Sequence, residues 1–124
     1  MNILVVDDCP DIANYIAELL RSYGHNVVTL TDPSAALERA KVMNFDLAYL
    51  GIVMPSMSGF ELGIRIRKLL PHCAVILGSE DVPPSEIIRF VRHGFGYLSA
   101  PFELEDLLSE IRRLCANGGR RPIG

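Results

Sequence analysis

The side chains best suited to chemistry in this chain come directly after short apolar runs. Asp7 and Asp8 follow the first run, and Ser79 follows a later one. Carboxylate and hydroxyl oxygens act as nucleophiles when a neighbouring base or cation activates them. Gly51 and Ala100 follow two other runs and supply no reactive group. The sequence therefore offers oxygen atoms without an evident activating partner.

Other common site patterns are missing from the sequence. The first strand–helix turn reads Asp7-Asp8-Cys9-Pro10, which is not a glycine-rich phosphate loop. The three cysteines form no C-x-x-C pair, and no histidine has a partner at metal-ligand spacing. We therefore expect neither a zinc site nor a disulfide framework.

Length and composition are typical of one soluble domain. The chain has 124 residues, of which 49% are hydrophobic and 22% charged. No run of about 18 apolar residues is present to span a bilayer, and the early acids do not suit a secretory signal. The formal net charge is −3, and basic residues are interspersed with acids, so we expect no nucleic acid or membrane partner. We expect a cytoplasmic protein.

Five short apolar runs alternate with stretches of helical period. The first, third and fourth runs are apolar almost throughout, which is typical of strands buried on both faces of a parallel sheet. The predicted strands are Ile3–Val6, Val27–Leu30, Leu47–Leu50, Val75–Leu77 and the weaker Tyr97–Leu98.

Helix-start and helix-stop residues separate these runs. The predicted helices run from Pro10 to a stop at Gly24, from the Asp32 cap through Met43, from a capping box at Ser58 to about Leu70, from Pro83-Pro84 to about His93, and from Leu104 to Asn117. The expected buried face of the first helix is Ile12, Ile16, Leu19, Leu20 and Tyr23, and that of the last is Leu104, Leu107, Leu108, Ile111 and Leu114.

This alternation predicts right-handed crossovers and a parallel α/β sheet covered on both faces. We expect one domain over residues 1–117 and a flexible tail or cut linker over residues 118–124. Ligand and catalytic groups of such sheets gather outside the carboxyl ends of the strands. The residues after the first, third, fourth and fifth strands should therefore lie side by side.

Several motifs, in this order and spacing, resemble the receiver domain of bacterial two-component response regulators. They are Ile3-Leu4-Val5-Val6-Asp7-Asp8, Phe45-Asp46-Leu47, Met54-Pro55-Ser56-Met57-Ser58-Gly59, Gly94, Tyr97-Leu98 and Pro101-Phe102. The resemblance covers nearly the whole chain. It implies a flavodoxin-like doubly wound (βα)5 fold with strand order 2-1-3-4-5, and a signalling module of phosphorelay signal transduction that is not an enzyme.

The resemblance also implies a role for individual residues. Asp7 and Asp8 match the acidic pair whose carboxylates hold Mg²⁺, and Val53 matches the residue whose carbonyl completes that metal site. Ser79 matches the hydroxyl that hydrogen-bonds the phosphoryl group. Tyr97 matches the aromatic switch residue that moves with it.

The resemblance breaks at two positions. Gly51 stands where the family has the phosphorylated aspartate, and Ala100 stands where it has a lysine that pairs with that aspartate and the phosphoryl oxygens. Glycine offers no oxygen to attack phosphorus, whereas the missing lysine removes only a stabilising charge. The formal pocket charge is −2 with or without the aspartate–lysine pair, so the two losses are electrostatically coherent. We expect a phosphorylation-independent signalling or protein-interaction module.

The sequence also leaves three alternatives to a phosphorylation-independent module. Asp8, or a serine among Ser56, Ser58 and Ser79, is a candidate substitute phosphoryl acceptor. The crevice at the strand ends is a candidate site for a small ligand such as a flavin. Asp7, Asp8 and the Val53 carbonyl form a remnant Mg²⁺ site of weak affinity, and no cofactor is required.

The predicted partner surface combines the fourth helix, the fifth strand and the fifth helix. We expect Phe90, Ile87 and Tyr97 to contribute to it, with Phe90 exposed. The alternative is that the fourth helix has a wide core face. The expected partner is a histidine kinase-like protein, an output or effector protein, or a second copy of the chain.

Overall fold

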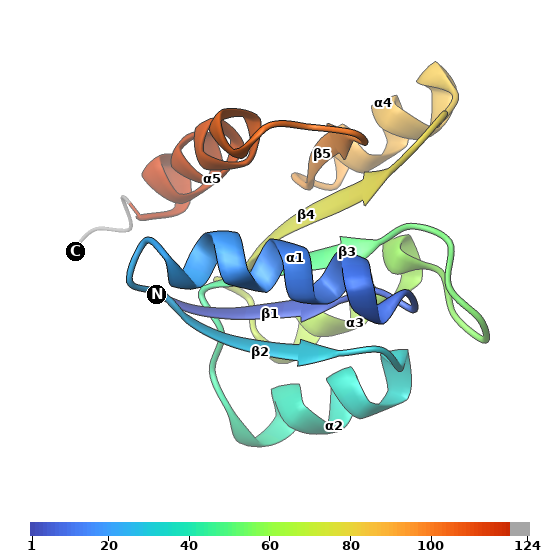
Figure 1. The fold of residues 1–124 in the computed structure, drawn as a ribbon. Coiled ribbons are helices and arrows are strands. Elements are labelled where there is room, and N and C mark those ends of the chain that lie inside the picture. Colours follow the sequence, from blue (N-terminus) through green and yellow to red (C-terminus); the bar gives the residue numbers. More distant parts are fainter. Residues whose placement is uncertain (120–124) are drawn as a thin grey trace.

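The computed structural model describes the backbone of residues 1–119 and the side chains of residues 1–115. Its centre is one five-stranded parallel sheet in the order β2-β1-β3-β4-β5, as predicted (Figure 1). The strands are β1 (Asn2–Val6), β2 (Asn26–Leu30), β3 (Leu47–Gly51), β4 (Ala74–Ser79) and β5 (Gly96–Ser99).

The central strands are apolar throughout because both of their faces are covered. All five residues of β3 are buried, and so are the last four residues of β1. The register pairs Ile3 with Leu47 and Gly51 with Gly78. Since the strands are parallel, their carboxyl ends meet at one edge of the sheet.

Five helices connect the strands, with bounds close to those predicted. They are α1 (Pro10–Arg21), α2 (Pro33–Val42), α3 (Gly59–Leu69), α4 (Pro84–Arg92) and α5 (Leu104–Gly119). The Asp32 carboxylate accepts from the Ser34 amide at 3.3 Å, and the Ser58 hydroxyl accepts from the Glu61 amide at 3.1 Å. These side chains satisfy amides that have no partner within the helix.

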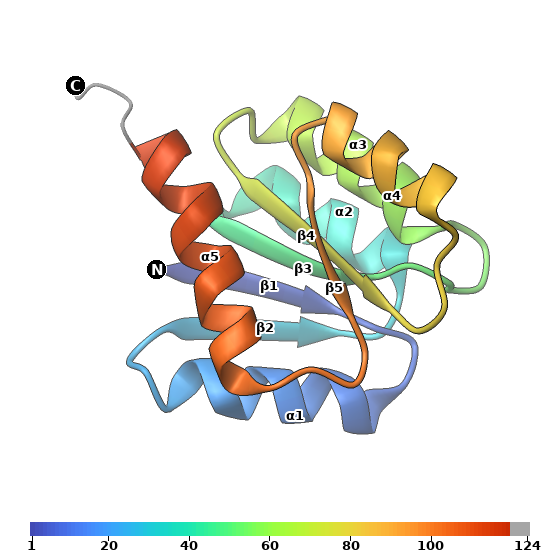
Figure 2. The same ribbon diagram turned by 90° about the horizontal axis from the view of Figure 1, so that it is seen from above.

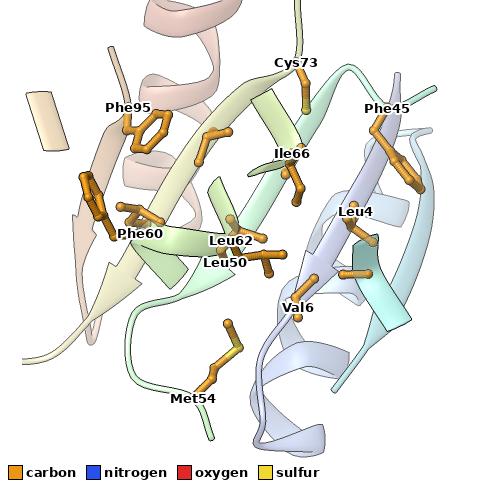
Figure 3. Close-up of a cluster of buried hydrophobic side chains, with 14 of the residues drawn as sticks. Leu4, Val6, Phe45, Leu50, Met54, Phe60, Leu62, Ile66, Cys73 and Phe95 are labelled. Atoms are coloured by element: carbon orange, nitrogen blue, oxygen red, sulfur yellow. The ribbon is translucent and has the colours of Figure 1, made fainter. Parts of the chain in front are cut away.

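Two hydrophobic clusters fill the two sides of the sheet. One cluster lies under α1 and α5 and includes Ile16, Leu20 and Leu107. The other lies under α2, α3 and α4 (Figure 2) and includes Phe90 and Leu62, of which Leu62 is labelled in Figure 3. The sheet is thus the middle layer of a three-layer sandwich.

The predicted buried face of α1 is partly wrong. Ile12 is 46% exposed and Tyr23 is 56% exposed, whereas Ala13 and Ala17 are buried beside Ile16 and Leu20. Small side chains let this helix lie close to the sheet. The helix therefore turns its alanines inward and Ile12 outward, and Tyr23 lies beyond its last residue.

The prediction that Phe90 is exposed is also wrong. Phe90 is 1% exposed, and its ring packs 5.6 Å from that of Phe60 and 6.3 Å from that of Tyr97. Helical period places residue 90 on the core side of α4 and turns Ile88 and Val91 outward, at 53% and 59% exposure. The apolar surface of α4 belongs to these two residues.

The C-terminal helix continues past the predicted end of the domain. Helix α5 extends through Gly119, beyond residue 117. The rest of the predicted tail, residues 120–124, lies outside the described residues. None of the helices in the described part of the chain has the length and apolar character needed to cross a bilayer.

Replacing Phe90 tests this packing. We expect Phe90→Ala to lower the free energy of unfolding by about 3–5 kcal/mol, because it leaves a cavity between α3, α4 and β5. Ile88→Ala on the outer side of the same helix should change it by less than about 0.5 kcal/mol. Urea denaturation measures both values. Equal losses for the two variants would contradict the orientation of α4.

Candidate functional site at the carboxyl edge of the sheet

An open hollow of about 250 Å³ lies at the carboxyl edge of the sheet. In Figure 1 the arrowheads of β1, β3 and β4 point to this edge. The predicted meeting of the four loops is confirmed, because the hollow is lined by residues that follow β1, β3, β4 and β5. The lining residues include Asp7, Asp8, Tyr49, Gly51, Val53, Gly78, Ser79 and Ala100.

Asp7 is the most enclosed charged group of the site. Its side chain is 9% exposed, and its Oδ1 accepts from the Cys9 amide at 2.9 Å. Burial raises the pKa of the Asp7 carboxyl above its ordinary value, the Cys9 hydrogen bond opposes this rise, and the neighbouring Asp8 carboxylate adds to it. Asp8 itself is exposed. The Asp7 carboxylate is therefore enclosed by the protein, whereas the Asp8 carboxylate is open to solvent.

The backbone of Gly51 leaves space that the Asp7 carboxylate occupies. A Cβ atom built on Gly51 would lie 2.8 Å from Asp7 Oδ2 and 3.2 Å from Asp7 Cγ. The chain after Gly51 is fixed by backbone bonds from the Ile52 amide to the Gly78 carbonyl (3.2 Å) and from the Gly59 amide to the Ile52 carbonyl (2.9 Å). Any side chain at position 51 would thus require Asp7 to rotate away.

Ser79 and Ala100 lie side by side at the same edge. The Ala100 amide donates to the Ser79 carbonyl at 2.9 Å, and the Ser79 hydroxyl donates to the Glu80 carbonyl at 3.3 Å. The peptide bond between Ala100 and Pro101 is cis. Val53 also reaches the rim of the hollow, where it is 77% exposed.

Tyr97 lies on β5, on the side of the sheet covered by α3 and α4. It is half-buried and packs against the cluster that contains Phe90. Its amide donates to Glu110 Oε2 on α5 at 3.1 Å, which connects β5 to that helix. Ile87 on α4 is half-buried as well. On the predicted partner surface Tyr97 and Ile87 are half-buried, whereas Ile88 and Val91 are 53% and 59% exposed.

Sequence reasoning missed Tyr49 as a residue of the site. It is 2% exposed, its ring lies 6.1 Å from that of Phe102, and it also lines the hollow. Burial raises the pKa of the Tyr49 phenol, and the Asp7 carboxylate adds to the rise. The available signal was a tyrosine in a buried aliphatic strand, two residues before Gly51 and hence on the same face.

Comparison with known proteins identifies the family. The response regulator receiver domain model matches residues 3–112, so the chain belongs to the family of receiver domains of two-component systems. The chain is 30% identical over 120 residues to the probable transcriptional regulatory protein TcrX of Mycobacterium tuberculosis, covering 96% of this chain and 51% of TcrX.

Two further relatives agree with this assignment. The heme response regulator HssR of Staphylococcus aureus is 31% identical over 109 residues, covering 88% of this chain and 49% of HssR. The chemotaxis protein CheY4 of Vibrio cholerae superposes with a TM-score of 0.83 at 28% identity, covering 91% of this chain and 97% of CheY4. The chain spans about half the length of TcrX and HssR.

The family implies Mg²⁺ at Asp7, Asp8 and the Val53 carbonyl, but these groups do not fit a complete site. Mg²⁺ demands near-octahedral oxygen geometry at short distances. Asp7 Oδ1 is engaged by a backbone amide, and Asp7 Oδ2 is turned over Gly51, where no third carboxylate is present. Only Asp8 presents a carboxylate to solvent at this point.

The link between β5 and α5 predicts a pH-dependent stability. The hydrogen bond from Arg113 lowers the pKa of Glu110, burial opposes this, and the Tyr97 amide lowers it further. A lowered pKa gives stability above the ordinary glutamate value of 4.5, and this stability is lost as pH falls through the folded-state pKa.

Glu110→Gln should therefore destabilise the protein at pH 7 by about 1–2 kcal/mol, with a difference from the parent that shrinks below pH 4.5. Urea denaturation at several pH values measures it. The matched control is Glu38→Gln, which removes a similar i,i+3 contact to Lys41 from a side chain that is 73% exposed and should change little. A loss of stability in Glu110→Gln that does not change with pH would contradict the lowered pKa of Glu110.

Proposed function

We propose that this receiver domain acts as a signalling or protein-interaction module without accepting a phosphoryl group. The observation that carries the proposal is Gly51 at the end of β3, with the Asp7 carboxylate turned over its Cα. In the resembling family, the phosphorylated aspartate occupies this position. Here the strand ends without an oxygen nucleophile.

The chemistry of phosphoryl transfer supports this proposal. Transfer requires an oxygen in line with the phosphorus atom and cations that neutralise the equatorial oxygens. Gly51 removes the nucleophile, and Ala100 removes the ammonium group expected beside it. The first loss abolishes the step, whereas the second only slows it. We expect Mg²⁺ to bind weakly, because Asp8 is the one carboxylate of the pair that is exposed to solvent.

The alternative acceptors have less support. The Ser58 hydroxyl is already the N-cap of α3, and the Ser79 hydroxyl donates to a neighbouring carbonyl. Asp8 is exposed at the rim of the hollow, so it is the strongest alternative acceptor. No lysine or histidine is among the lining residues of that hollow to activate it.

A module without an acceptor transmits its signal by binding. Receiver domains as a family interact with histidine kinases and output domains, and we propose a protein partner of this kind in the cytoplasm. The surface of α4, β5 and α5 supports the proposal, because Ile88 and Val91 are exposed beside half-buried Ile87 and Tyr97. A partner shifts the conformational equilibrium only by its differential affinity for the two states.

Incubation with acetyl phosphate and Mg²⁺, followed by intact-mass analysis, tests the proposal. We expect the chain to keep its unmodified mass while a receiver domain with an acceptor aspartate gains one phosphoryl group in the same conditions. A stoichiometric adduct on the unaltered chain would overturn the proposal. Its loss in Asp8→Asn would then assign the acceptor to Asp8.

Restoring the family residues provides the complementary test. We expect Gly51→Asp combined with Ala100→Lys to gain a phosphoryl adduct, because Asp7, Asp8 and Ser79 are still in place. The Asp7 carboxylate has to rotate first, since it lies within 3.2 Å of the new Cβ position. Ala100→Lys alone is the matched control and should stay unmodified. Modification of that control would place the acceptor elsewhere in the chain.

A further inference from the structure

The Tyr49 side chain reaches along β4 to the carboxyl edge of the sheet. Tyr49 pairs with Ile76 in the β3–β4 register, and Gly78 is two residues further along, a distance of about 6.6 Å in an extended strand. A Cβ built on Gly78 would lie 2.5 Å from Tyr49 Cζ and would overlap the phenolic oxygen. The end of the tyrosine ring therefore lies directly over the Cα atom of Gly78.

The position of this hydroxyl matters because Gly78 is the direct neighbour of Gly51 across the sheet. The two glycines are paired, and strand alternation directs both Cβ positions to the face that Tyr49 occupies. Neighbouring strands are about 4.8 Å apart. The Tyr49 hydroxyl is therefore about one strand spacing from the point where a side chain at position 51 would begin.

Asp7 approaches the same space from the other neighbouring strand. Its Oδ2 atom lies over Gly51, as Tyr49 lies over Gly78. Tyr49 is buried in the cluster under α1 and α5 and also lines the hollow. This is the usual arrangement of a buried tyrosine, with an apolar body and a polar tip.

We propose that Tyr49, accommodated by Gly78, lies at the inner end of the hollow, beside the place in which a receiver normally holds its acceptor side chain and divalent cation. Tyr49 is a positioning residue: it occupies the inner end of the hollow and keeps a cation away from the Asp7 carboxylate. This inference rests on the proposed function, since it explains what replaced the phosphoryl site. It also predicts that Tyr49 weakens the cation binding that Gly51→Asp restores.

Titration with Mn²⁺, followed by electron paramagnetic resonance of the free ion, measures this effect without requiring phosphorylation. We expect Gly51→Asp combined with Tyr49→Leu to bind Mn²⁺ at least about tenfold more tightly than Gly51→Asp alone. The matched control is Gly51→Asp with Tyr23→Leu, because Tyr23 is a 56% exposed tyrosine outside the hollow. That control should bind like Gly51→Asp. Equal affinity in all three proteins would overturn the inference.

A second measurement uses stability and does not depend on a metal. Gly78→Ala should lower the urea midpoint of the parent protein, because the new methyl group overlaps the Tyr49 hydroxyl. In the Tyr49→Leu background the same change should lower the midpoint much less. Equal shifts in both backgrounds would overturn the placement of Tyr49 over Gly78.

The two proposals fail separately. A phosphoryl adduct on the unaltered chain overturns the proposed function, whatever Tyr49 does. Unchanged Mn²⁺ affinity after Tyr49→Leu overturns the role of Tyr49 and leaves the missing acceptor at Gly51 as it was.

Discussion

Burial of the parallel sheet on both of its faces is the constraint on which the rest of this molecule depends. Helices α1 and α5 cover one face, and α2, α3 and α4 cover the other, so the inner strands carry apolar side chains almost throughout. Polar groups that serve a site then gather where the strands end. Asp7, Ser79 and Ala100 meet there because the register of β1, β3, β4 and β5 brings their strand ends together.

Burial on both faces also explains why Gly51 and Gly78 change the positions of neighbouring side chains. In a closely packed sheet a missing side chain leaves space that neighbouring groups occupy. The Asp7 carboxylate lies over Gly51, and the Tyr49 ring lies over Gly78. The cost is visible in the raised pKa of Asp7, because burial and the nearby Asp8 disfavour its charged form. The Asp7 and Tyr49 side chains thus take up space at the inner end of the hollow.

Sequence reasoning predicted the helix bounds from local signals. The strand order was implied by the resemblance to receiver domains, and the meeting of the loops follows from a parallel sheet. Asp32 and Ser58 mark helix starts by chemistry that acts within three residues. The predicted exposure of Phe90 and burial of Ile12 were wrong, because the side of an apolar helix that faces the core depends on the elements it packs against. Sequence reasoning missed Tyr49 because the space over Gly78 depends on the pairing of β3 with β4, which are separated in the chain by the whole of α3.

Tyr49 in the hollow and Tyr97 on the partner surface lie on opposite sides of the sheet, and both lie near the end of β4. Tyr49 and Gly51 face α1 and α5, whereas Tyr97 packs toward α3 and α4. Gly78 contacts Tyr49 on the first side, and the next residue, Ser79, is tied through its carbonyl to the Ala100 amide after β5. Since packed cores adopt discrete arrangements, a ring fixed over Gly78 restrains the backbone that β5 pairs with. Gly78 pairs with Leu98, the residue after Tyr97, so the Tyr49 ring packs against the strand that positions β5.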